Sequence, residues 1–404
     1  MVKASELSWD DVVRVGPGTL GGNYLRCFWW PVALSEEVRD VPVPVKVLGE
    51  ELVLFRDLSG HLALLGAHCS HRRASLEYGR IEEQGIRCAY HGWYYDRQGR
   101  ILDRPAEPIK TAPGIRQNWY PVRELGGFVF AHMGPDKESP PPLPRYDVLV
   151  QDGYRVAERG DAESGKAYKC NWLQGVENTT DTTHLAYLHG IFESCPIFKA
   201  VEGEFGVKIY ILEHGSNPNT VRVRKRCTVL PTINRKSREP RAKNPDRLRA
   251  QVQQAIWIVP IDDTRCEEMR LTVYSEPPKD KRYHGIYQDR ARQTERKPYD
   301  RRLFGDITGI VPLEDKAMVE SQGEIVDRTL EHPGYGDRAI LLLRKMIRDG
   351  IADVAQGRKP KGVLQEELPM IDLDIGFEEF EIDKAPEVIR DLLPELEAQV
   401  AKAG

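Results

Sequence analysis

Two short pairs of cysteine and histidine constrain this chain more than any other feature of its sequence. Cys69 and His71 have one residue between them, Cys88 and His91 have two, and sixteen residues separate the pairs. Thiolates and imidazoles bind soft or borderline metals, so the pairs predict either a structural zinc site or a [2Fe-2S] cluster with two histidine ligands. Because each loop contributes one cysteine and one histidine, the order favours the cluster, with one iron on the cysteines and the other on the histidines.

Composition narrows the class of protein further. The 404 residues are 40% hydrophobic and 30% charged, which is typical of a soluble globular protein. The net charge of -4 gives no overall positive field, so we expect no nucleic-acid partner. Seven cysteines do not form a disulfide framework, and the first residues lack the apolar run of a signal or membrane segment. We therefore expect a cytoplasmic protein without a membrane contact.

The pattern along the chain predicts two domains after a short N-terminal helical segment at residues 1–25. Short β-branched or leucine-rich runs separated by turn residues, as in residues 41–65, predict an antiparallel β domain over residues 26–145. The proline-rich residues 135–144 favour an extended linker at its end. Residues 146–404 mix alternating strands with helical periodicity, so we expect an α+β domain there and an α+β fold class for the chain.

The most informative helical stretch is residues 171–188. Glu177, Asp181 and His184 are spaced four and three residues apart, which would place them on one helical face. His189 would lie about 140° away from His184 on a straight helix, so we expect the helix to kink or end between them. Two further predicted helices cover residues 338–348 and 386–402.

Two histidines and one carboxylate form the facial triad of non-haem Fe(II) oxygenases, which leaves positions open for dioxygen. His184 and His189 are the candidate imidazole ligands. The spacing does not identify the carboxylate. The eligible residues are Glu177, Asp181, Asp306, Asp315, Asp327 and Asp337.

These motifs together resemble a known family. Residues 69–79 and 86–100, CSHRRASLEYG and IRCAYHGWYYDRQGR, resemble the Rieske domain of aromatic-ring-hydroxylating oxygenases. Residues 15–38 are similar to the opening of the phthalate dioxygenase group, and the chain would then be a large (alpha) subunit. Residues 177–189 match the family pattern ENxxDxxHxxxxH. In the family's closing motif, the aspartate that opens the last core helix binds iron, which implies Asp337 as the third ligand.

The resemblance implies a terminal oxygenase with a Rieske-type [2Fe-2S] cluster and a mononuclear Fe(II). Such an enzyme uses O2 and electrons from an NAD(P)H-dependent reductase carrying flavin and iron-sulfur groups, with or without a separate ferredoxin. The expected substrate is a small aromatic compound, carboxylated or methoxylated. Dihydroxylation, monohydroxylation and O-demethylation all remain open, because the same ligands support each reaction.

The family's assembly is a head-to-tail homotrimer in which one subunit's cluster serves its neighbour's iron. By resemblance, Asp181 would join His91 of one chain to His184 of the next. Two alternatives belong to other classes: a Rieske-type electron carrier without oxygenase activity and a zinc-stabilised binding module. A carrier needs only about one hundred residues and has no use for His184, His189 and Asp337.

A basic segment, residues 235–249, contains seven Lys and Arg residues. Guanidinium groups bind carboxylates with two parallel hydrogen bonds, so this segment could recognise a carboxylated substrate. A solvated surface loop is the interpretation that we favour for this segment.

Overall fold

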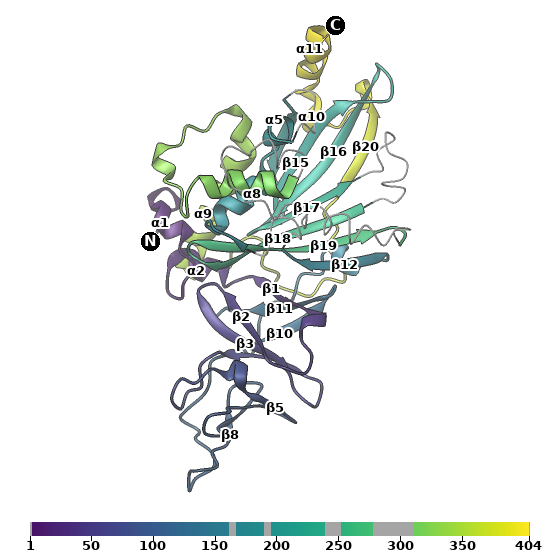
Figure 1. Cartoon of the computed structure of the whole chain (residues 1–404). Coiled ribbons are helices and arrows are strands. Elements are labelled where there is room, and N and C mark those ends of the chain that lie inside the picture. Colours follow the sequence, from purple (N-terminus) through teal and green to yellow (C-terminus); the bar gives the residue numbers. More distant parts are fainter. Residues whose placement is uncertain (1, 161–166, 190–194, 239–251, 278–310, 404) are drawn as a thin grey trace.

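The computed structural model describes residues 2–160, 167–189, 195–238, 252–277 and 311–403. Two regions are stacked along the long axis of the molecule (Figure 1): an N-terminal β region, residues 29–132, and a C-terminal α+β region, residues 147–403. This arrangement confirms the predicted α+β class. No helix in the described part of the chain is both long and apolar enough to cross a bilayer.

The N-terminal β region contains three antiparallel sheets, in the orders β1-β11-β10, β2-β3-β4-β9 and β5-β6-β7-β8. The hairpins predicted at residues 41–65 are confirmed by the pairing of β2 with β3 and of β3 with β4. The strands are β1 (Trp29–Leu34), β2 (Val43–Val47), β3 (Glu50–Arg56), β4 (Leu62–Gly66), β5 (Arg80–Glu82), β6 (Gly85–Arg87), β7 (Tyr94–Asp96), β8 (Ile101–Asp103), β9 (Trp119–Tyr120), β10 (Val122–Leu125) and β11 (Phe128–His132).

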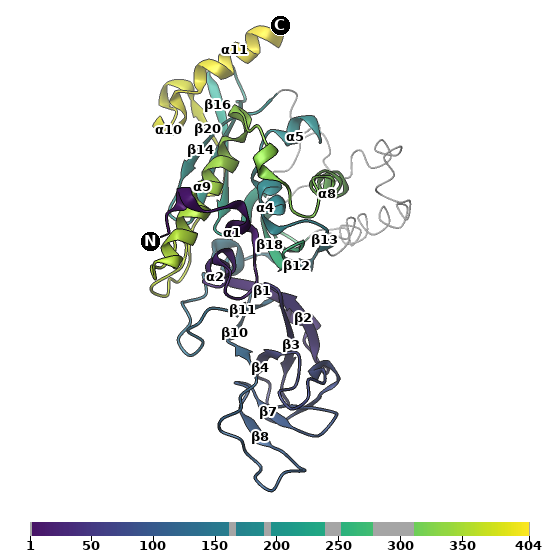
Figure 2. The same cartoon turned by 90° about the vertical axis from the view of Figure 1, so that its left-hand side faces the viewer.

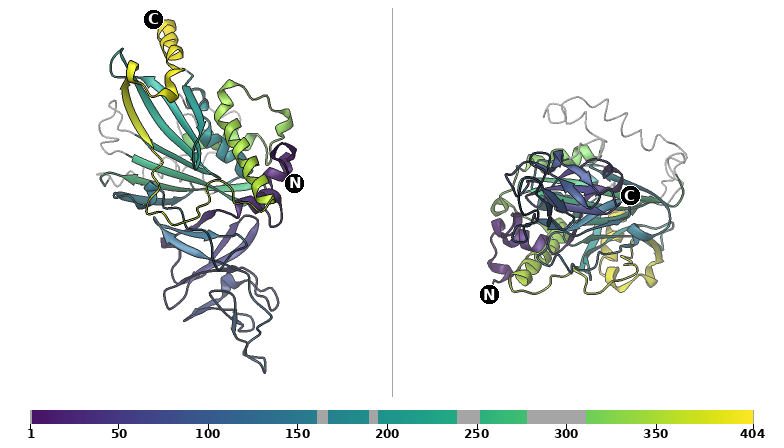
Figure 3. Two further views of the ribbon diagram at one scale, coloured as in Figure 1. Left: turned by 180° about the vertical axis from the view of Figure 1, so that it is seen from behind. Right: turned by 90° about the horizontal axis from the view of Figure 1, so that it is seen from below.

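The C-terminal region is built on a nine-stranded antiparallel sheet with the path β12-β19-β18-β17-β16-β15-β14. Strand β13 pairs with β19, and β20 pairs with β16. In the left view of Figure 3, the yellow strand β20 lies beside the teal strands of the sheet. The strands are β12 (Tyr154–Arg159), β13 (Ala167–Tyr168), β14 (Ile197–Glu202), β15 (Gly206–His214), β16 (Thr220–Val229), β17 (Ile233–Arg238), β18 (Val252–Asp262), β19 (Arg265–Tyr274) and β20 (Gly376–Glu381).

Helices α4 and α9 cover one face of this sheet (Figures 1 and 2), where α9 packs on β14 and β15 and α4 packs on β17 and β18, whereas α10 and α11 pack on the opposite face of β15 and β16. The α-helices are α1 (Trp9–Val13), α2 (Leu20–Leu25), α3 (Asp147–Val150), α4 (Trp172–Thr180), α5 (His184–Tyr187), α8 (Val311–Ser321), α9 (Arg338–Ala355), α10 (Glu387–Arg390) and α11 (Leu393–Ala403). The 3-10 turns are η1 (Ala4–Glu6), η2 (Ser35–Glu37), η3 (Leu76–Tyr78), η6 (Arg328–Leu330), η7 (Tyr335–Asp337) and η8 (Ile382–Lys384).

The N-terminal helices belong spatially to the C-terminal region, although the chain enters the β region directly after them. Helix α2 packs against α9, where Gly350 allows the ring of Tyr24 to approach; a Cβ at this glycine would lie 2.5 Å from the ring. The indole of Trp9 contacts three guanidinium groups, with Arg328 and Arg344 both at 5.2 Å from its ring centre and Arg348 at 4.3 Å. Trp9 therefore links η6 to α9 through these contacts.

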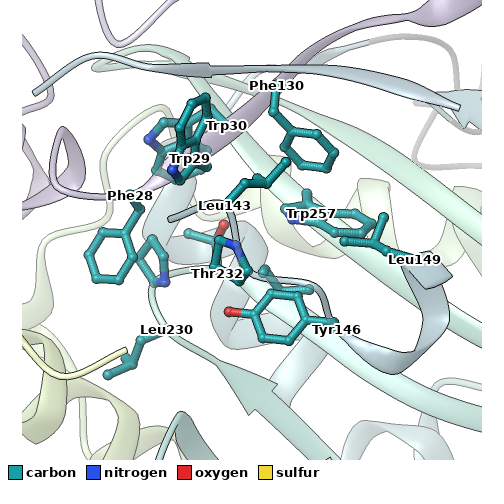
Figure 4. Close-up of a pocket in the computed structure, with 13 residues that line it drawn as sticks. Phe28, Trp29, Trp30, Phe130, Leu143, Tyr146, Leu149, Leu230, Thr232 and Trp257 are labelled. Atoms are coloured by element: carbon teal, nitrogen blue, oxygen red, sulfur yellow. The ribbon is translucent and has the colours of Figure 1, made fainter. Parts of the chain in front are cut away.

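An aromatic cluster joins the two regions. Trp257 of β18 makes edge-on contacts with Phe128 and Phe130 of β11, at ring-centre distances of 5.6 and 6.0 Å. A cavity of about 20 Å³ remains at this junction, room for about one water molecule, and Trp29 and Trp30 also line it (Figure 4). The cluster packs one sheet of the β region directly against the nine-stranded sheet, so the two regions share one core.

Candidate metal centres

The first candidate centre lies in the two loops that carry the Cys/His pairs. Each loop is closed by backbone hydrogen bonds: Arg73 N donates to the Cys69 carbonyl at 2.8 Å, and Gly92 N donates to the Cys88 carbonyl at 3.0 Å. Gly92 and Arg73 have positive φ values of 74° and 65°, which the tight turns require. These hydrogen bonds fix the backbone of both loops.

The four side chains of this centre meet with the thiols inside and the imidazoles outside. Cys69 and Cys88 are buried, and the rings of His71 and His91 lie 4.6 Å apart in an edge-on arrangement. Burial, with a smaller contribution from the neighbouring Cys88, raises the pKa of the Cys69 thiol in the absence of metal. The paired soft donors and paired imidazoles fit a [2Fe-2S] cluster whose histidine side faces the surface.

Two aromatic residues support this centre. The Tyr95 hydroxyl lies 3.0 Å from Cys69 Sγ and 3.0 Å from Ser70 Oγ. The indole of Trp93 stacks on His71, with 4.7 Å between ring centres and 7° between planes. A hydroxyl that donates to a ligand sulfur stabilises the more negative, reduced form of a cluster.

The second candidate centre begins where α4 breaks. Helix α4 ends at Thr180, and Asp181 takes an extended conformation with φ -59° and ψ 140° before α5 starts at His184. The expectation that Glu177, Asp181 and His184 share one helical face is therefore wrong. The helix does end between the two histidines, as expected, because α5 stops at Tyr187, and a further break at Asp181 precedes His184. Asp181 stabilises the new turn, because its carboxylate accepts hydrogen bonds from Thr183 N at 2.8 Å and His184 N at 3.3 Å.

The break brings His184 and His189 to a common carboxylate, Asp315 of α8. Asp315 Oδ1 lies 2.9 Å from His189 Nε2 and 3.5 Å from His184 Nε2. One ligand atom from each of the three residues lies within 4.8 Å of the others. Two imidazole nitrogens and one carboxylate oxygen facing the same point are the donor set of a facial triad.

Two further carboxylates orient the imidazoles from behind. Asp181 Oδ2 lies 3.0 Å from His184 Nδ1, and Glu314 Oε2 lies 2.6 Å from His189 Nδ1. A carboxylate accepting from Nδ1–H fixes the tautomer that leaves the Nε2 lone pair free for a metal. The group thus combines two imidazoles with three carboxylates, whose negative charge a divalent cation would partly neutralise.

The surrounding carboxylates shift the pKa values of His189 and Asp315 in opposite directions. Burial disfavours the charged imidazole of His189, but its hydrogen bonds to Asp315 and Glu314 outweigh burial and raise its pKa. Burial opposes ionisation of Asp315 as well, yet its contacts with His189 and His184 lower its pKa. A bound cation would replace the proton that His189 otherwise attracts.

The structure groups Asp315, and not the expected Asp337, with the two histidines. Asp337 Oδ2 instead accepts a hydrogen bond from Gly334 N at 2.7 Å, where it closes the turn before α9. A carboxylate at a helix start is favoured by the exposed N–H groups there, which gives Asp337 a structural role.

The remaining eligible carboxylates are also engaged elsewhere or lie outside the described residues. Glu177 forms ion pairs with Arg344 at 2.7 Å and Arg328 at 3.0 Å. Asp327 accepts hydrogen bonds from Thr329. Asp306 falls outside the described residues.

Two residues of this centre were not singled out by the sequence analysis. Glu314 precedes the ligand on α8, and the side chain of Asn178 hydrogen-bonds Asp315. The adjacent acidic residues of the Glu314–Asp315 pair were the available signal, because one helix can direct neighbouring side chains to two sides of a histidine.

The basic segment is described only at its start. Arg235 is buried on β17, where its guanidinium binds both carboxylate oxygens of Asp147, at 3.1 and 2.7 Å. Its charge is therefore used within the fold rather than for a ligand. Residues 239–249 lie outside the described residues.

Comparisons with known proteins agree with this geometry. A family model for the Rieske [2Fe-2S] domain matches residues 28–113. The chain is 33% identical to a tert-butanol monooxygenase / tert-amyl alcohol desaturase oxygenase subunit from Aquincola tertiaricarbonis, covering 85% of this chain and 77% of that protein. It is also 33% identical to a phenoxybenzoate dioxygenase alpha subunit from Ectopseudomonas oleovorans, covering 86% of each.

A third relative is the 5,5'-dehydrodivanillate O-demethylase oxygenase subunit of a Sphingobium species, 31% identical over 88% of this chain and 82% of that protein. Among solved structures, Pseudomonas putida NdmA has the same fold, with a TM-score of 0.64 and 18% identity over 85% of this chain and 96% of that one. The oxygenase–ferredoxin complex of carbazole 1,9a-dioxygenase contains a chain with a TM-score of 0.56 and 22% identity, over 85% of this chain and 94% of that one.

We expect Tyr95→Phe to lower the reduction potential of the first centre by about 60 mV. A hydrogen bond worth roughly 1.4 kcal/mol more in the reduced state corresponds to that shift for one electron. Redox titration followed by visible absorbance or electron paramagnetic resonance measures it. Tyr94→Phe is the matched control, because the Tyr94 hydroxyl accepts from Gln84 N instead. Equal potentials in Tyr95→Phe and the unmodified protein would contradict the assignment.

We expect Asp315→Asn to lose the second centre's metal, because the amide removes the charged donor between the two histidines. Iron should fall from about three to about two atoms per chain while sulfide stays near two. Metal and sulfide analysis of anaerobically reconstituted protein measures both. Asp337→Asn is the control and should keep all of its iron. The reverse pattern would restore Asp337 as the ligand.

Proposed function

The chain belongs to the Rieske non-haem iron oxygenases as a large oxygenase subunit, and from this premise we propose how its own residues carry the reaction. It uses O2 to hydroxylate or O-demethylate a small aromatic compound. Its similarity over most of its length to complete oxygenase subunits excludes the electron-carrier alternative. The convergence of His184, His189 and Asp315 on one point is the observation that carries the proposal.

The residues divide between two groups. Cys69 and Cys88 would hold one iron of the cluster, and His71 and His91 the other. His184, His189 and Asp315 would hold the mononuclear iron. When bound, the cluster supplies single electrons and the mononuclear iron supplies the dioxygen chemistry.

The protein's own contribution at the second centre is orientation and exclusion of water. Asp181 and Glu314 hold the Nδ1 protons of the two histidines, so that both Nε2 atoms stay directed at the metal position. The side chain of His189 is completely buried, which keeps bulk water from its ring. Asn178 fixes Asp315 by a side-chain hydrogen bond. A dry and fixed donor set directs oxidation to the bound substrate.

We further propose a head-to-tail homotrimer in which electrons cross between subunits. The loops with β5 and β8 form one end of the molecule, whereas α5 lies beyond the β1–β11 layer, in the C-terminal region (Figures 1 and 2). Seen from below, the N-terminal β region overlies the nine-stranded sheet (Figure 3). This separation favours transfer from a neighbour's cluster, and Asp181, bonded to His184, is the residue we assign to bridge to the neighbour's His91.

The electron donor is proposed to be a reductase with flavin and iron-sulfur groups, directly or through a ferredoxin. The ferredoxin complex of carbazole 1,9a-dioxygenase supports this class of partner for a protein of this fold. Substrate candidates are methoxylated and carboxylated aromatic compounds, supported by the relatives named for phenoxybenzoate and dehydrodivanillate.

Product analysis with a generic reductase tests the reaction. We expect substrate-dependent O2 uptake with formaldehyde from a methoxylated substrate or a hydroxylated ring product. A cis-diol would identify dihydroxylation, and formaldehyde would identify demethylation. Protein with both metal groups intact that produced neither from any aromatic substrate would contradict the proposed function.

We expect Asp181→Asn to keep both metal groups while turnover falls by roughly 100-fold. The neutral amide no longer offers a charged acceptor to His184 or to the neighbouring subunit's His91. Stopped-flow oxidation of the reduced cluster measures the step directly. Asp327→Asn, which alters an exposed turn cap, is the control and should react normally. Unchanged electron transfer in Asp181→Asn would remove Asp181 from the route.

A further inference from the structure

The nine-stranded sheet has two chemically different faces where β16, β17 and β18 meet. Register places Thr228 opposite Asn234 and Asn234 opposite Ile256, on the face that α4 covers. The other face carries Ile233 opposite Trp257 and packs on the N-terminal β region. Buried polar side chains on the α4 face therefore lie on the side of the second metal centre.

Asn234 is completely buried on this face and is only half satisfied. Its Nδ2 donates to the Thr179 carbonyl at 2.7 Å, and a carbonyl can only accept, so the amide cannot be turned over. Its Oδ1 has no hydrogen-bond partner anywhere in the described ranges. A buried acceptor without a partner costs roughly 1–3 kcal/mol and is uncommon in folded proteins, which points to a missing donor.

A second amide on the same face also has one unpartnered end, although its partner is a hydroxyl, which can bind either end of the amide. Gln254 is 4% exposed, its Nε2 donates to Thr272 Oγ1 at 3.2 Å, and its Oε1 has no partner among the residues with described positions. Gln254 lies two residues along β18 from Ile256, the register partner of Asn234. Such diagonal neighbours have Cα atoms about 7–8 Å apart, so the two amides lie next to each other on this face.

The Asn234 amide is tied to the second metal centre by the turn that it contacts. Thr179, which accepts its hydrogen bond, follows Asn178, whose side chain binds Asp315. Two residues after Thr179, Asp181 orients His184. A molecule held by Asn234 is thus held beside the residues that carry the proposed iron ligands.

The charge on this face indicates which polar group is missing. Arg226 donates to the Thr179 carbonyl at 2.8 Å, and Arg270 pairs with Glu268 at 2.7 Å. Each of these two guanidinium groups therefore has an acceptor within the protein, and Lys236, the register partner of Gln254, is a third cation on this face. The two amide oxygens would repel a carboxylate and attract a hydroxyl hydrogen.

We propose that Asn234 and Gln254 form a polar subsite that binds the hydroxyl group of a phenolic substrate. Asn234 Oδ1 is the principal acceptor, and Gln254 provides a second one along the ring. This inference rests on the proposed function and specifies its substrate class. In this role both residues determine specificity without taking part in the oxygen chemistry.

Binding to the iron-loaded full-length protein under anaerobic conditions tests the proposal. Calorimetric titration compares 2-methoxyphenol with 1,2-dimethoxybenzene, and 4-hydroxybenzoate with 4-methoxybenzoate, pairs that differ by one hydroxyl hydrogen replaced by methyl. We expect the unmodified protein to prefer the phenol of at least one pair by roughly 10- to 100-fold. Asn234→Leu and Gln254→Met should each reduce this preference, and Asn234→Leu should reduce it most.

Gln253→Met is the matched control, because Gln253 is the neighbouring glutamine on the other face, where it accepts from Arg235 at 2.8 Å. It should keep the full preference for phenols. Three results would overturn the subsite. They are equal affinities within both pairs, binding of no phenol at all, and a preference for phenols that stays unchanged in Gln254→Met and in folded Asn234→Leu protein. Those results would leave the oxygenase function standing if other aromatic substrates still gave product, whereas absence of product from every substrate would contradict the function itself.

Discussion

The hydrogen bonds from two carboxylates to the Nδ1 atoms of His184 and His189 are the constraint on which the catalytic region depends. Each bond fixes one imidazole in position and in tautomer. To make both bonds, the chain must break α4 at Asp181 and must place α8 so that Glu314 and Asp315 lie on two sides of His189. The irregular backbone of residues 181–189 is thus a requirement of the donor set.

The large sheet provides the rigid support for this arrangement. Its apolar face meets the aromatic cluster of the N-terminal β region, and its other face carries α4 and the buried amides. Helix α4 is held from the outside as well, because Glu177 pairs with Arg344 and Arg328. Helix α4 is therefore fixed from both sides. The histidines of the first centre, in contrast, remain partly exposed for electron exchange.

Sequence analysis could predict features that are local in the chain. The ligand loops around Cys69 and Cys88 are encoded by short spacings and turn residues, and the two histidines near the end of α4 lie within nine residues of Asp181. The third ligand lies more than one hundred residues away, and spacing carries no information on such a contact. Asp337 fitted a helix start, but Asp315 has the required position in space.

The same limit applies to the charged residues. Arg235 belonged to a basic segment that suggested a ligand site, yet Asp147 neutralises it inside the fold. Glu177 matched a family motif and lay near the histidines, yet two arginines occupy its carboxylate. Only tertiary packing decides which of many carboxylates and guanidinium groups are already paired.

The contact between Trp9 and the arginines of η6 and α9 has a practical consequence for reading sequence variation. The same guanidinium groups that lie against this indole, Arg328 and Arg344, hold Glu177 on α4. A replacement of Trp9 would weaken the support of α4, and we expect it to be observed as a loss of bound iron. Such a variant could be mistaken for an active-site lesion, although its origin is a distant mechanical support.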